Sequence, residues 1–473
     1  MFPNSSVIFQ ATRRTLSFPG TRSGGALGLL GLFLLSACSD GTYLTDGVVL
    51  INTGQESDAW TSEPVAKDVL LEMVQGTSRT TLARVPAPAT SISIGTGGPA
   101  SAVASFEATA FDANGNAVMK GSSVDLAIFG FEDASVPLFM GRAGGLSRAP
   151  ENLVFPWRRP QVAILYHAYL LISGGDEASS NLDVYDMARW VAAPTQQPLP
   201  KVPRSWAVSG SKLLLIDDTG ALWLDMSTYI TSAVVPPSGL DNDAILGGET
   251  IGSPGDPQYI VGGTRATGEP TDQVLRVDAD GSLHLIKLHT PRLGAAAAIV
   301  NGQLLVVGGS DAGAGAEVSN SAGTEFNELP FESDAKQGAA LVALDEENVM
   351  LAGGRDPATD DEISGFRSMD LTCAENCSQV EIAKAAFPFT HPRLFLLADD
   401  QLLAVGEDPT SEETHVFTFD TGIGHALNEF ALRTPRKQAS AFLLPNGQIG
   451  VLGGLALENG NPASSVELFF PQP

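Results

Sequence analysis

Leu304-Leu-Val-Val-Gly308-Gly309 decides the fold of this chain, because versions of it recur along the C-terminal two-thirds. In each version a short apolar run ends in a Gly-Gly pair or its remnant, as a buried strand does where the backbone turns sharply. The first glycines of successive copies stand 88, 46, 45, 53 and 47 residues apart. The copies end at Gly174-Gly175, Gly262-Gly263, Gly308-Gly309, Gly353-Gly354, Gly406-Glu407 and Gly453-Gly454.

The gap of 88 residues is twice the usual spacing, so it predicts a hidden copy near residue 218. Leu213-Leu-Leu-Ile-Asp217-Asp218 stands there, with the apolar run kept and the glycines lost. That makes seven units of about 45 residues, a period typical of propellers and solenoids. In the unit from Pro291 we expect strands at Ala295–Val300 and Gln303–Val307, joined by a tight Asn301-Gly302 turn, and then two weaker strands.

Seven four-stranded units arranged radially would bury their faces against one another. Such a ring must close, and the last unit stops at its third strand, Val466–Phe470. The fourth strand must therefore come from elsewhere in the chain. We expect Val136–Arg142, directly before the first unit, to supply it and to latch the ring.

The first unit continues after its glycine pair with Val184-Tyr-Asp186-Met-Ala-Arg-Trp190. An apolar run, Gly-Gly, a loop, a Tyr and then a Trp resemble the kelch repeat, and the resemblance covers about residues 136–473. It implies an all-β fold, a seven-bladed kelch-like β-propeller over residues 133–473, similar to the central domain of galactose oxidase. The Tyr and Trp half of the repeat is good only in the first unit, so the periodicity carries most of the resemblance.

Residues 63–132 alternate between apolar and polar positions, which predicts a small β-sandwich in front of the propeller. This region resembles the bacterial immunoglobulin-like modules of exported proteins, although no single residue defines it; the alternative is further irregular packing against the propeller. Residues 38–62 are polar and Gly-rich and are expected to form a tether. The expected strands are Asp68–Val74, Ser91–Ile94, Ser105–Phe111 and Ala117–Met119.

The N-terminus predicts export. Residues 1–37 contain no acid, and Arg13, Arg14 and Arg22 precede a ten-residue run, Ala26–Leu35, which is the length of a signal-peptide core and too short to span a bilayer. Leu35-Ser-Ala-Cys38 follows and resembles a lipobox. We therefore expect a lipoprotein signal peptide over residues 1–37, with Cys38 carrying the lipid that holds the protein on a membrane.

The route and the membrane are less well defined. Thr12-Arg13-Arg14-Thr15-Leu16 also resembles a twin-arginine signal, so the export route stays open. Ser39 follows the lipidated Cys, where enteric bacteria place Asp to retain lipoproteins in the inner membrane. The outer membrane or cell surface is therefore the expected extracytoplasmic location.

The chain has three cysteines. If lipid occupies Cys38, the remaining Cys373 and Cys377 are an even pair in an oxidising compartment, which predicts a local disulfide. A metal site is the alternative, but no His lies nearby in the sequence to complete it. The net charge of −27 argues against nucleic acid as a partner, since phosphates would be repelled.

A cation precedes the first strand of six units, at the mouth of the expected central channel. One hypothesis is a ring of guanidinium groups that binds an anionic ligand; the alternative is that each bridges neighbouring blades. His391 is also expected at the mouth, and the acidic loops 355–362 and 407–413 are either solvated loop tips or calcium sites. The candidate ligand-binding residues are Arg159, Arg204, Arg292, Arg393 and Arg436, with Lys336 in the fifth unit.

Two functions fit this sequence. The first is a membrane-anchored binding or scaffolding lipoprotein whose propeller face recognises a glycan, peptide or protein. The alternative is a carbohydrate-active, mutarotase-like enzyme acting in the central channel. Galactose oxidase uses copper with a cross-linked Tyr and Cys, but the six Tyr and six His here show no clustered pairing. We therefore predict no catalytic residue, metal or cofactor, and fold alone does not decide between the two functions.

Overall fold

The computed structural model describes most of the chain from Tyr43 onward. The described residues are 43–98, 103–127, 135–175, 179–193, 197–265, 267–311, 313–385, 390–397, 401–421 and 428–472. The predicted signal peptide and Cys38 lie outside them. The described residues contain no helix with the length and apolarity needed to cross a bilayer.

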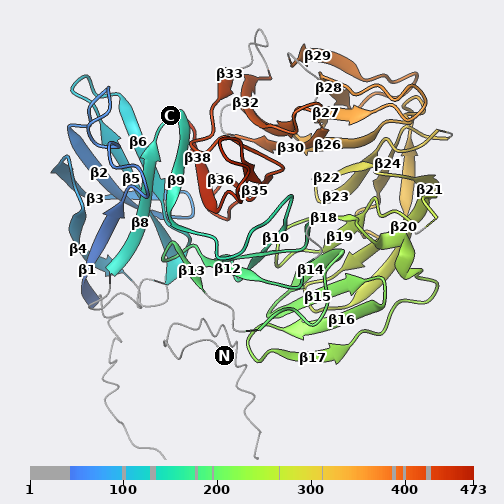
Figure 1. Cartoon of the computed structure of the whole chain (residues 1–473), viewed down its shortest axis with the longest axis horizontal. Helices are drawn as coiled ribbons and strands as arrows, with labels where there is room; N and C mark the ends of the chain where they lie inside the picture. The colour runs from blue at the N-terminus through green and yellow to red at the C-terminus, as the bar shows by residue number, and fades with distance from the viewer. Residues whose placement is uncertain are drawn as a thin grey trace, which may run out of the picture.

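Seven four-stranded antiparallel sheets form a β-propeller, as the repeat predicts (Figure 1). Strands β10, β14, β18, β22, β26, β30 and β35 surround the middle of the ring. Blade 1 consists of β10 (Gln161–Leu165), β11 (Tyr169–Ser173), β12 (Asp183–Asp186) and β13 (Val191–Ala193). Blade 2 consists of β14 (Ser205–Ser209), β15 (Lys212–Asp217), β16 (Gly220–Asp225) and β17 (Ile230–Ala233). Blade 3 consists of β18 (Glu249–Ile251), β19 (Gln258–Val261), β20 (Thr271–Val277) and β21 (Leu283–Arg292).

The other four blades continue around the ring. Blade 4 consists of β22 (Ala296–Val300), β23 (Gln303–Val307), β24 (Ala316–Ser319) and β25 (Phe326–Leu329), and blade 5 of β26 (Gln337–Ala343), β27 (Asn348–Arg355), β28 (Gly365–Asp370) and β29 (Val380–Lys384). Blade 6 consists of β30 (Thr390–Leu396), β31 (Gln401–Glu407), β32 (Thr414–Asp420) and β33 (Asn428–Phe430). Blade 7 consists of β35 (Ser440–Leu443), β36 (Ile449–Leu452), β38 (Ser465–Phe470) and β9 (Gly145–Asn152). A short pair, β34 (Arg436–Lys437) and β37 (Leu455–Ala456), and a single 3-10 turn, η3 (Asn242–Ile245), complete the described elements.

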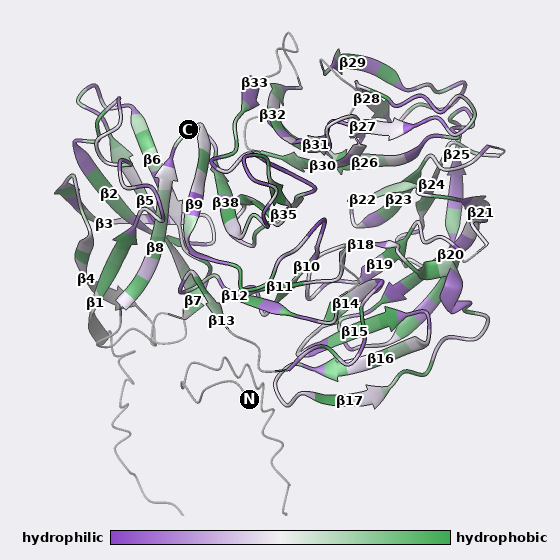
Figure 2. Ribbon diagram, in the orientation of Figure 1, coloured by the Kyte–Doolittle hydropathy of each residue, from purple (hydrophilic) through white to green (hydrophobic). Residues whose placement is uncertain are grey.

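The apolar runs of the repeat become the second strands of the blades, which are buried on both faces. Each pair of neighbouring blades shares a hydrophobic cluster, as in the contact of Leu305 in blade 4 with Leu351 in blade 5. Figure 2 shows these apolar segments along the inner strands of the ring. Burial against two neighbours explains why the runs are continuous in the sequence.

The hidden unit of the repeat is confirmed. Strand β15 pairs with β14 and β16 like any second strand, and Asp217 lies opposite Gly220. Only two residues join β15 to β16, so this blade needs no glycine pair to begin a long loop. The Lys201 Nζ donates to Asp217 Oδ1 at 2.5 Å and to the Gly220 carbonyl at 3.1 Å, which stabilises the short turn.

An N-terminal strand closes the ring, but the strand predicted for this role was wrong. The fourth strand of blade 7 is β9, which pairs antiparallel with β38. Val136–Arg142 lies instead in β8 (Ser135–Arg142) and pairs with β1 and β6 of the N-terminal sheet. Both edges of β8 are therefore already paired, so it has no free edge for β38, although Phe139 packs against Phe470 of blade 7.

The N-terminal region is one eight-stranded sheet with its own hydrophobic core. The four predicted strands are confirmed within it, and the sheet runs beyond the expected boundaries at both ends. β1 starts inside the segment expected as a tether, and β8 lies inside the range expected for the propeller. Besides β8, its strands are β1 (Tyr43–Asn52), β2 (Asp68–Gln75), β3 (Ser78–Pro86), β4 (Ser91–Gly98), β5 (Val103–Phe111), β6 (Ala117–Ser122) and β7 (Leu126–Ala127). Their order in the sheet is β3-β2-β5-β6-β8-β1-β4, and β7 pairs with β5.

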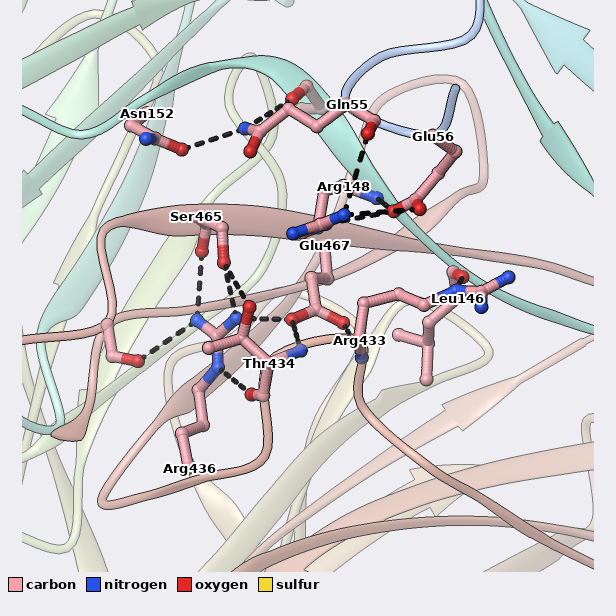
Figure 3. Close-up of polar contacts among 12 residues, drawn as sticks. Gln55, Glu56, Leu146, Arg148, Asn152, Arg433, Thr434, Arg436, Ser465 and Glu467 are labelled. Atoms are coloured by element: carbon pink, nitrogen blue, oxygen red, sulfur yellow. Dashed lines mark hydrogen bonds and ion pairs between the residues drawn. The ribbon is translucent and has the colours of Figure 1, made fainter. Parts of the chain in front are cut away.

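A polar seam joins this sheet to the closing strand (Figure 3). Glu56, in the loop after β1, accepts from the Arg148 Nε at 3.0 Å. Gln55 Nε2 donates to Asn152 Oδ1 at 2.8 Å. Burial acts to raise the pKa of Glu56, but the hydrogen bonds and charge of Arg148 outweigh it and leave the pKa below its ordinary value. The loop after β1 therefore holds β9 in place from outside the ring.

The predicted disulfide is present between Cys373 and Cys377, in the loop between β28 and β29 of blade 5. Cys377 also pairs through its backbone with Phe331, in the connection from blade 4 to blade 5. The bridge therefore fixes a loop that packs against the neighbouring blade.

We predict that the denatured, unreduced Cys38→Ser variant shows no reactive thiol, because the two remaining sulfurs are bonded. Replacing both Cys373 and Cys377 by Ser should lower the free energy of unfolding by about 2 kcal/mol or less, since so short a loop restricts the unfolded chain only slightly. Thiol labelling and denaturant unfolding measure the two effects. Two labelled thiols in the unreduced protein would contradict the bridge.

Candidate functional site

Arg292 is part of a buried charge network inside blade 4. Its Nη2 lies 3.0 Å from Glu317 Oε1, and both side chains are almost completely buried. The Arg292 Nη1 donates to the Gly308 carbonyl at 2.7 Å, while Glu317 accepts from the backbone N–H groups of His289 and Thr290. The pair therefore ties the entry to the blade, the glycine pair and the third strand together.

Blade 7 repeats this network (Figure 3). Arg436 is fully buried, contacts the Glu467 carboxylate and donates to the Ser465 carbonyl at 2.8 Å. Glu467 again accepts from two backbone N–H groups, those of Arg433 and Thr434. Burial lowers the pKa of both Arg292 and Arg436, while the carboxylate beside each opposes this effect.

In blade 1 the same position is occupied by an uncharged donor. Trp157 Nε1 donates to Asp183 Oδ2 at 2.8 Å, and Asp183 also accepts from the backbone of Val154 and Phe155. Burial raises the pKa of Asp183, because these donors are uncharged and only partly offset the loss of water. Trp157 thus takes the structural place of Arg292 and Arg436, which the Pro-Arg pattern of the sequence does not reveal.

The hypothesis of five converging guanidinium groups was therefore wrong in its geometry. Arg292 and Arg436 are buried within blades and hold the backbone, which agrees with the alternative of a structural role. Arg393, from blade 6, forms an ion pair with Glu249 of blade 3, on the opposite side of the ring. Arg204 is exposed, and its side chain has no hydrogen bond or ion pair within the described residues.

Arg159 belongs to a polar cluster at the channel mouth, the end of the ring where the first strand of each blade begins. Six blades place a residue with positive φ there, opposite the second glycine of the pair. In blades 3 to 5 it is a glycine, at 247, 294 and 338. In the consecutive blades 6, 7 and 1 it is His391 (φ 48°), Gln438 (φ 60°) and Arg159 (φ 43°).

These three side chains converge on two carboxylates, and we call Arg159, His391, Glu407, Glu412 and Gln438 the mouth cluster. Arg159 Nε lies 3.0 Å from Glu407 Oε1, and its Nη2 lies 3.3 Å from Glu412 Oε1. His391 Nδ1 lies 3.4 Å from Glu407 Oε2. Gln438 Nε2 donates to both oxygens of Glu412, at 2.9 and 3.0 Å.

The cluster combines a buried acid with exposed groups. The Glu407 side chain is 2% exposed, whereas His391 is 58% and Glu412 40% exposed. The hydrogen bond from Gln438, followed by contacts with Arg159, lowers the pKa of Glu412. Because that pKa lies below its unfolded value, Glu412 stabilises the fold at neutral pH, and this contribution is lost as the pH falls through the lowered pKa.

Two buried acceptors at the mouth lack a donor. The Oε1 atoms of Gln438 and of Gln161, the first residue of β10, accept no hydrogen bond within the described residues. A buried amide oxygen without a donor is costly, so such atoms need an explanation. Both atoms are enclosed by protein, so a ligand on the surface reaches them only if a side chain moves.

Calcium at the acidic loops finds no support in the contacts. Glu407 and Glu412, which the calcium hypothesis would use, are held by Arg159 and Gln438, and Arg355 forms an ion pair with Asp360. Within the described part of the chain, no three His, Cys, Asp or Glu side chains lie close enough to hold a metal ion.

Part of the mouth cluster was not predictable from the sequence. Arg159 and His391 were placed at the mouth by their position before the first strand. The sequence marks Glu407 as a lost glycine and as part of an acidic loop, but a carboxylate at that position is also the signal that a cation lies opposite. Gln438 follows Pro435-Arg436 by two residues and carries no motif of its own.

No protein-family model matches this chain, and no curated protein matches it. Several solved structures resemble its fold. A fungal alcohol oxidase of the AA5 family, in complex with copper, is 15% identical over 69% of this chain and 76% of that one, with a TM-score of 0.37. YjhT is 12% identical over 67% and 96%, with a TM-score of 0.38. A streptogramin B lyase is 12% identical over 68% and 96%, with a TM-score of 0.43.

We predict that Arg436→Ala lowers the free energy of unfolding by about 3–5 kcal/mol, because it leaves Glu467 buried without its cation. Arg204→Ala is the matched control, and it should change the free energy by no more than about 0.5 kcal/mol, since that side chain is exposed. Denaturant unfolding of the two variants is the measurement. Equal stability of the two would contradict the structural role of Arg436.

Proposed function

We propose that this protein is a lipid-anchored extracytoplasmic binding protein, and that its propeller recognises a hydroxyl-rich ligand, a glycan, at the mouth cluster. The observation that carries the proposal is the convergence of three left-handed non-glycine residues, from blades 6, 7 and 1, on Glu407 and Glu412. Blades 3 to 5 show that glycine fits the same backbone position. The side chains of blades 6, 7 and 1 are therefore kept at a cost to stability.

That cost supports a role in binding. A non-glycine residue in the left-handed region costs about 1–2 kcal/mol relative to the ordinary conformation. Such residues cluster at ligand sites, where the surrounding structure holds them in place. Arg159, His391 and Gln438 share this backbone conformation within one cluster. The ring of His391 is exposed and Arg159 is partly exposed at the channel mouth, whereas Gln438 is buried behind them.

The chemistry of the cluster favours hydroxyl groups over a carboxylate. Glu407 and Glu412 offset the charge of Arg159, and Glu249 offsets that of Arg393 across the mouth. No excess of positive charge therefore remains at the cluster to bind an anion. The exposed ring of His391 offers a hydrogen-bonding nitrogen, and the partly exposed carboxylate of Glu412 offers acceptor oxygens. A sugar hydroxyl can both donate and accept, so it matches these groups.

A carbohydrate-active enzyme is the second candidate, and one observation favours it. His391 lies against the buried carboxylate of Glu407, and a His oriented by an acid is able to move a proton to or from a bound substrate. Change of the sugar during incubation with the protein, followed by NMR, would distinguish catalysis from binding.

We predict that His391→Gly weakens binding of a neutral oligosaccharide by about two- to tenfold, the loss of one hydrogen bond. The same change should leave the free energy of unfolding unchanged or raise it by up to about 1 kcal/mol, because glycine relieves the backbone strain. Calorimetry with a panel of neutral oligosaccharides and their uronic-acid counterparts measures the affinity.

Asn301→Gly is the matched control for this experiment. Asn301 also has positive φ (49°), but it lies in the β22–β23 turn, at the opposite end of the blade from the mouth. It should show the gain in stability without any loss of affinity. Binding of the uronic acids alone would contradict the proposed ligand class, and an unaltered affinity of His391→Gly would contradict the site.

The lipid anchor is the other half of the proposal. It is supported by the sequence around Cys38, and the N-terminal sheet would stand between the anchor and the propeller as the expected immunoglobulin-like module. The outer membrane or cell surface is the proposed location.

We predict that Cys38→Ala releases the protein from the membrane fraction or blocks its processing, because no thiol remains to accept the lipid. Fractionation of cells that express the full chain, followed by immunoblotting, is the measurement. A variant that is processed normally and stays with the membrane would show that the anchor lies elsewhere.

A further inference from the structure

The connection between the proposed anchor and the folded body is short. β1 begins at Tyr43, which is paired with Gly98 of β4. Four residues lie between Cys38 and Tyr43 in the sequence. Even fully extended, this connection spans no more than about 18 Å. A lipid on Cys38 would therefore hold the start of β1 close to the bilayer, and the protein would have little freedom to turn.

The start of β1 and the outer strand of blade 2 lie on the same side of the molecule. Figure 1 shows β1 beginning at the lower end of the N-terminal sheet, while β17 forms the lower edge of the propeller. The outer strand of blade 5, β29, lies at the upper edge of the same view. A membrane that reaches the start of β1 from below would thus meet β17 and not β29.

The surface of β17 differs from the other outer strands. All four of its residues are exposed, Ile230 is 65% and Val235 87% exposed, and residues 230–235 carry no charge. The outer strands β21, β25, β29, β33 and β9 each contain charged residues, and β13 is uncharged but half-buried. An uncharged, exposed edge is uncommon on a chain with a net charge of −27, and edge strands are normally protected by charges or by cover.

Pro236 and Pro237 lie shortly after this strand, which ends at Ala233. Proline has no backbone N–H, so pairing of this edge with a strand from another chain is limited to the few residues up to Val235. A lipid surface needs no hydrogen-bond register with the strand, so it suits this edge better than a β-strand of a second protein does.

We propose that β17 and the following residues to Val235 rest on the headgroup region of the bilayer, so that the propeller stands with its rim on the membrane. The inference rests on the lipid anchor proposed for Cys38. The partner is a phospholipid surface of low negative charge, because the acidic body of the protein repels anionic lipid. Uncharged side chains at this contact lose less hydration than charged ones would.

The test uses the lipidated full-length protein in phosphatidylcholine vesicles that carry a nitroxide on the headgroup. An environment-sensitive fluorophore is attached to Ile230→Cys or, as a matched control, to Val380→Cys, an apolar outer-strand residue that is 57% exposed in blade 5. The two native cysteines of blade 5 are bridged and do not react. We expect the label at position 230 to be quenched several times more strongly than the label at position 380.

A second variant tests whether the short connection to the lipid, and not an affinity of β17 itself for the bilayer, brings β17 to the membrane. A Gly-Ser spacer of about 20 residues, inserted after Ser39, frees the body from the bilayer while keeping the lipid. Quenching at position 230 should then fall to the level at position 380. Unchanged quenching at position 230 in the spacer variant would overturn the role of the short connection.

The remaining outcomes separate the two proposals. Protein that floats with the vesicles but shows equal quenching at both positions would overturn the membrane contact and leave the anchor intact. Protein that does not float at all would overturn the lipid anchor, and this inference with it.

Discussion

The pairing of β9 with β38 is the contact on which the ring depends. Each blade buries two faces only if it has a neighbour on both sides, so an open ring would expose the faces of blades 1 and 7. β9 supplies the outermost strand of blade 7 and leads directly into the chain that forms blade 1. It is also held from outside by Glu56 and Gln55 of the N-terminal region. The N-terminal sheet also packs on the propeller through Phe139 of β8, whose ring contacts Trp190 of blade 1 and Phe470 of blade 7.

A buried acid in the third strand gives the blades a second common constraint. Glu317 and Glu467 each hold two backbone N–H groups and an arginine, and Asp183 holds the equivalent groups with a tryptophan. Blade 5 reverses the charges at the corresponding position. Arg367 occupies the third strand and donates to the Gly353 carbonyl at 3.0 Å, and Asp334 lies in the loop that enters the blade. The reversed arrangement is less complete, because the buried Nε and Nη1 of Arg367 make no hydrogen bond within the described residues.

The sequence predicted the parts of the fold that depend on repetition. The hidden unit at Asp217 and the missing fourth strand at the C-terminus both followed from a period of about 45 residues. The closing strand was misplaced because the apolar β8 has the pattern of a buried strand, whereas the neighbouring β9 (Gly145–Asn152) is mostly polar. Only contacts distant in the sequence decide which of the two joins the propeller. The ring of five arginines failed for a related reason. A Pro-Arg pattern specifies the position of the arginine in the chain, whereas burial against Glu317 or Glu467 decides the direction that its side chain takes.

Ring closure also has a consequence for the time at which folding ends. Gly145 pairs with Phe470, so the contact that completes the propeller joins segments more than 300 residues apart. The closing strand β9 is synthesised before the other strands of the ring, and its partner β38 is synthesised after them. Contacts that are so distant in sequence form slowly, because the entropy of a long loop must be lost first. Until then β9 has no partner strand in blade 7, and the faces of blades 1 and 7 that meet in the closed ring stay exposed.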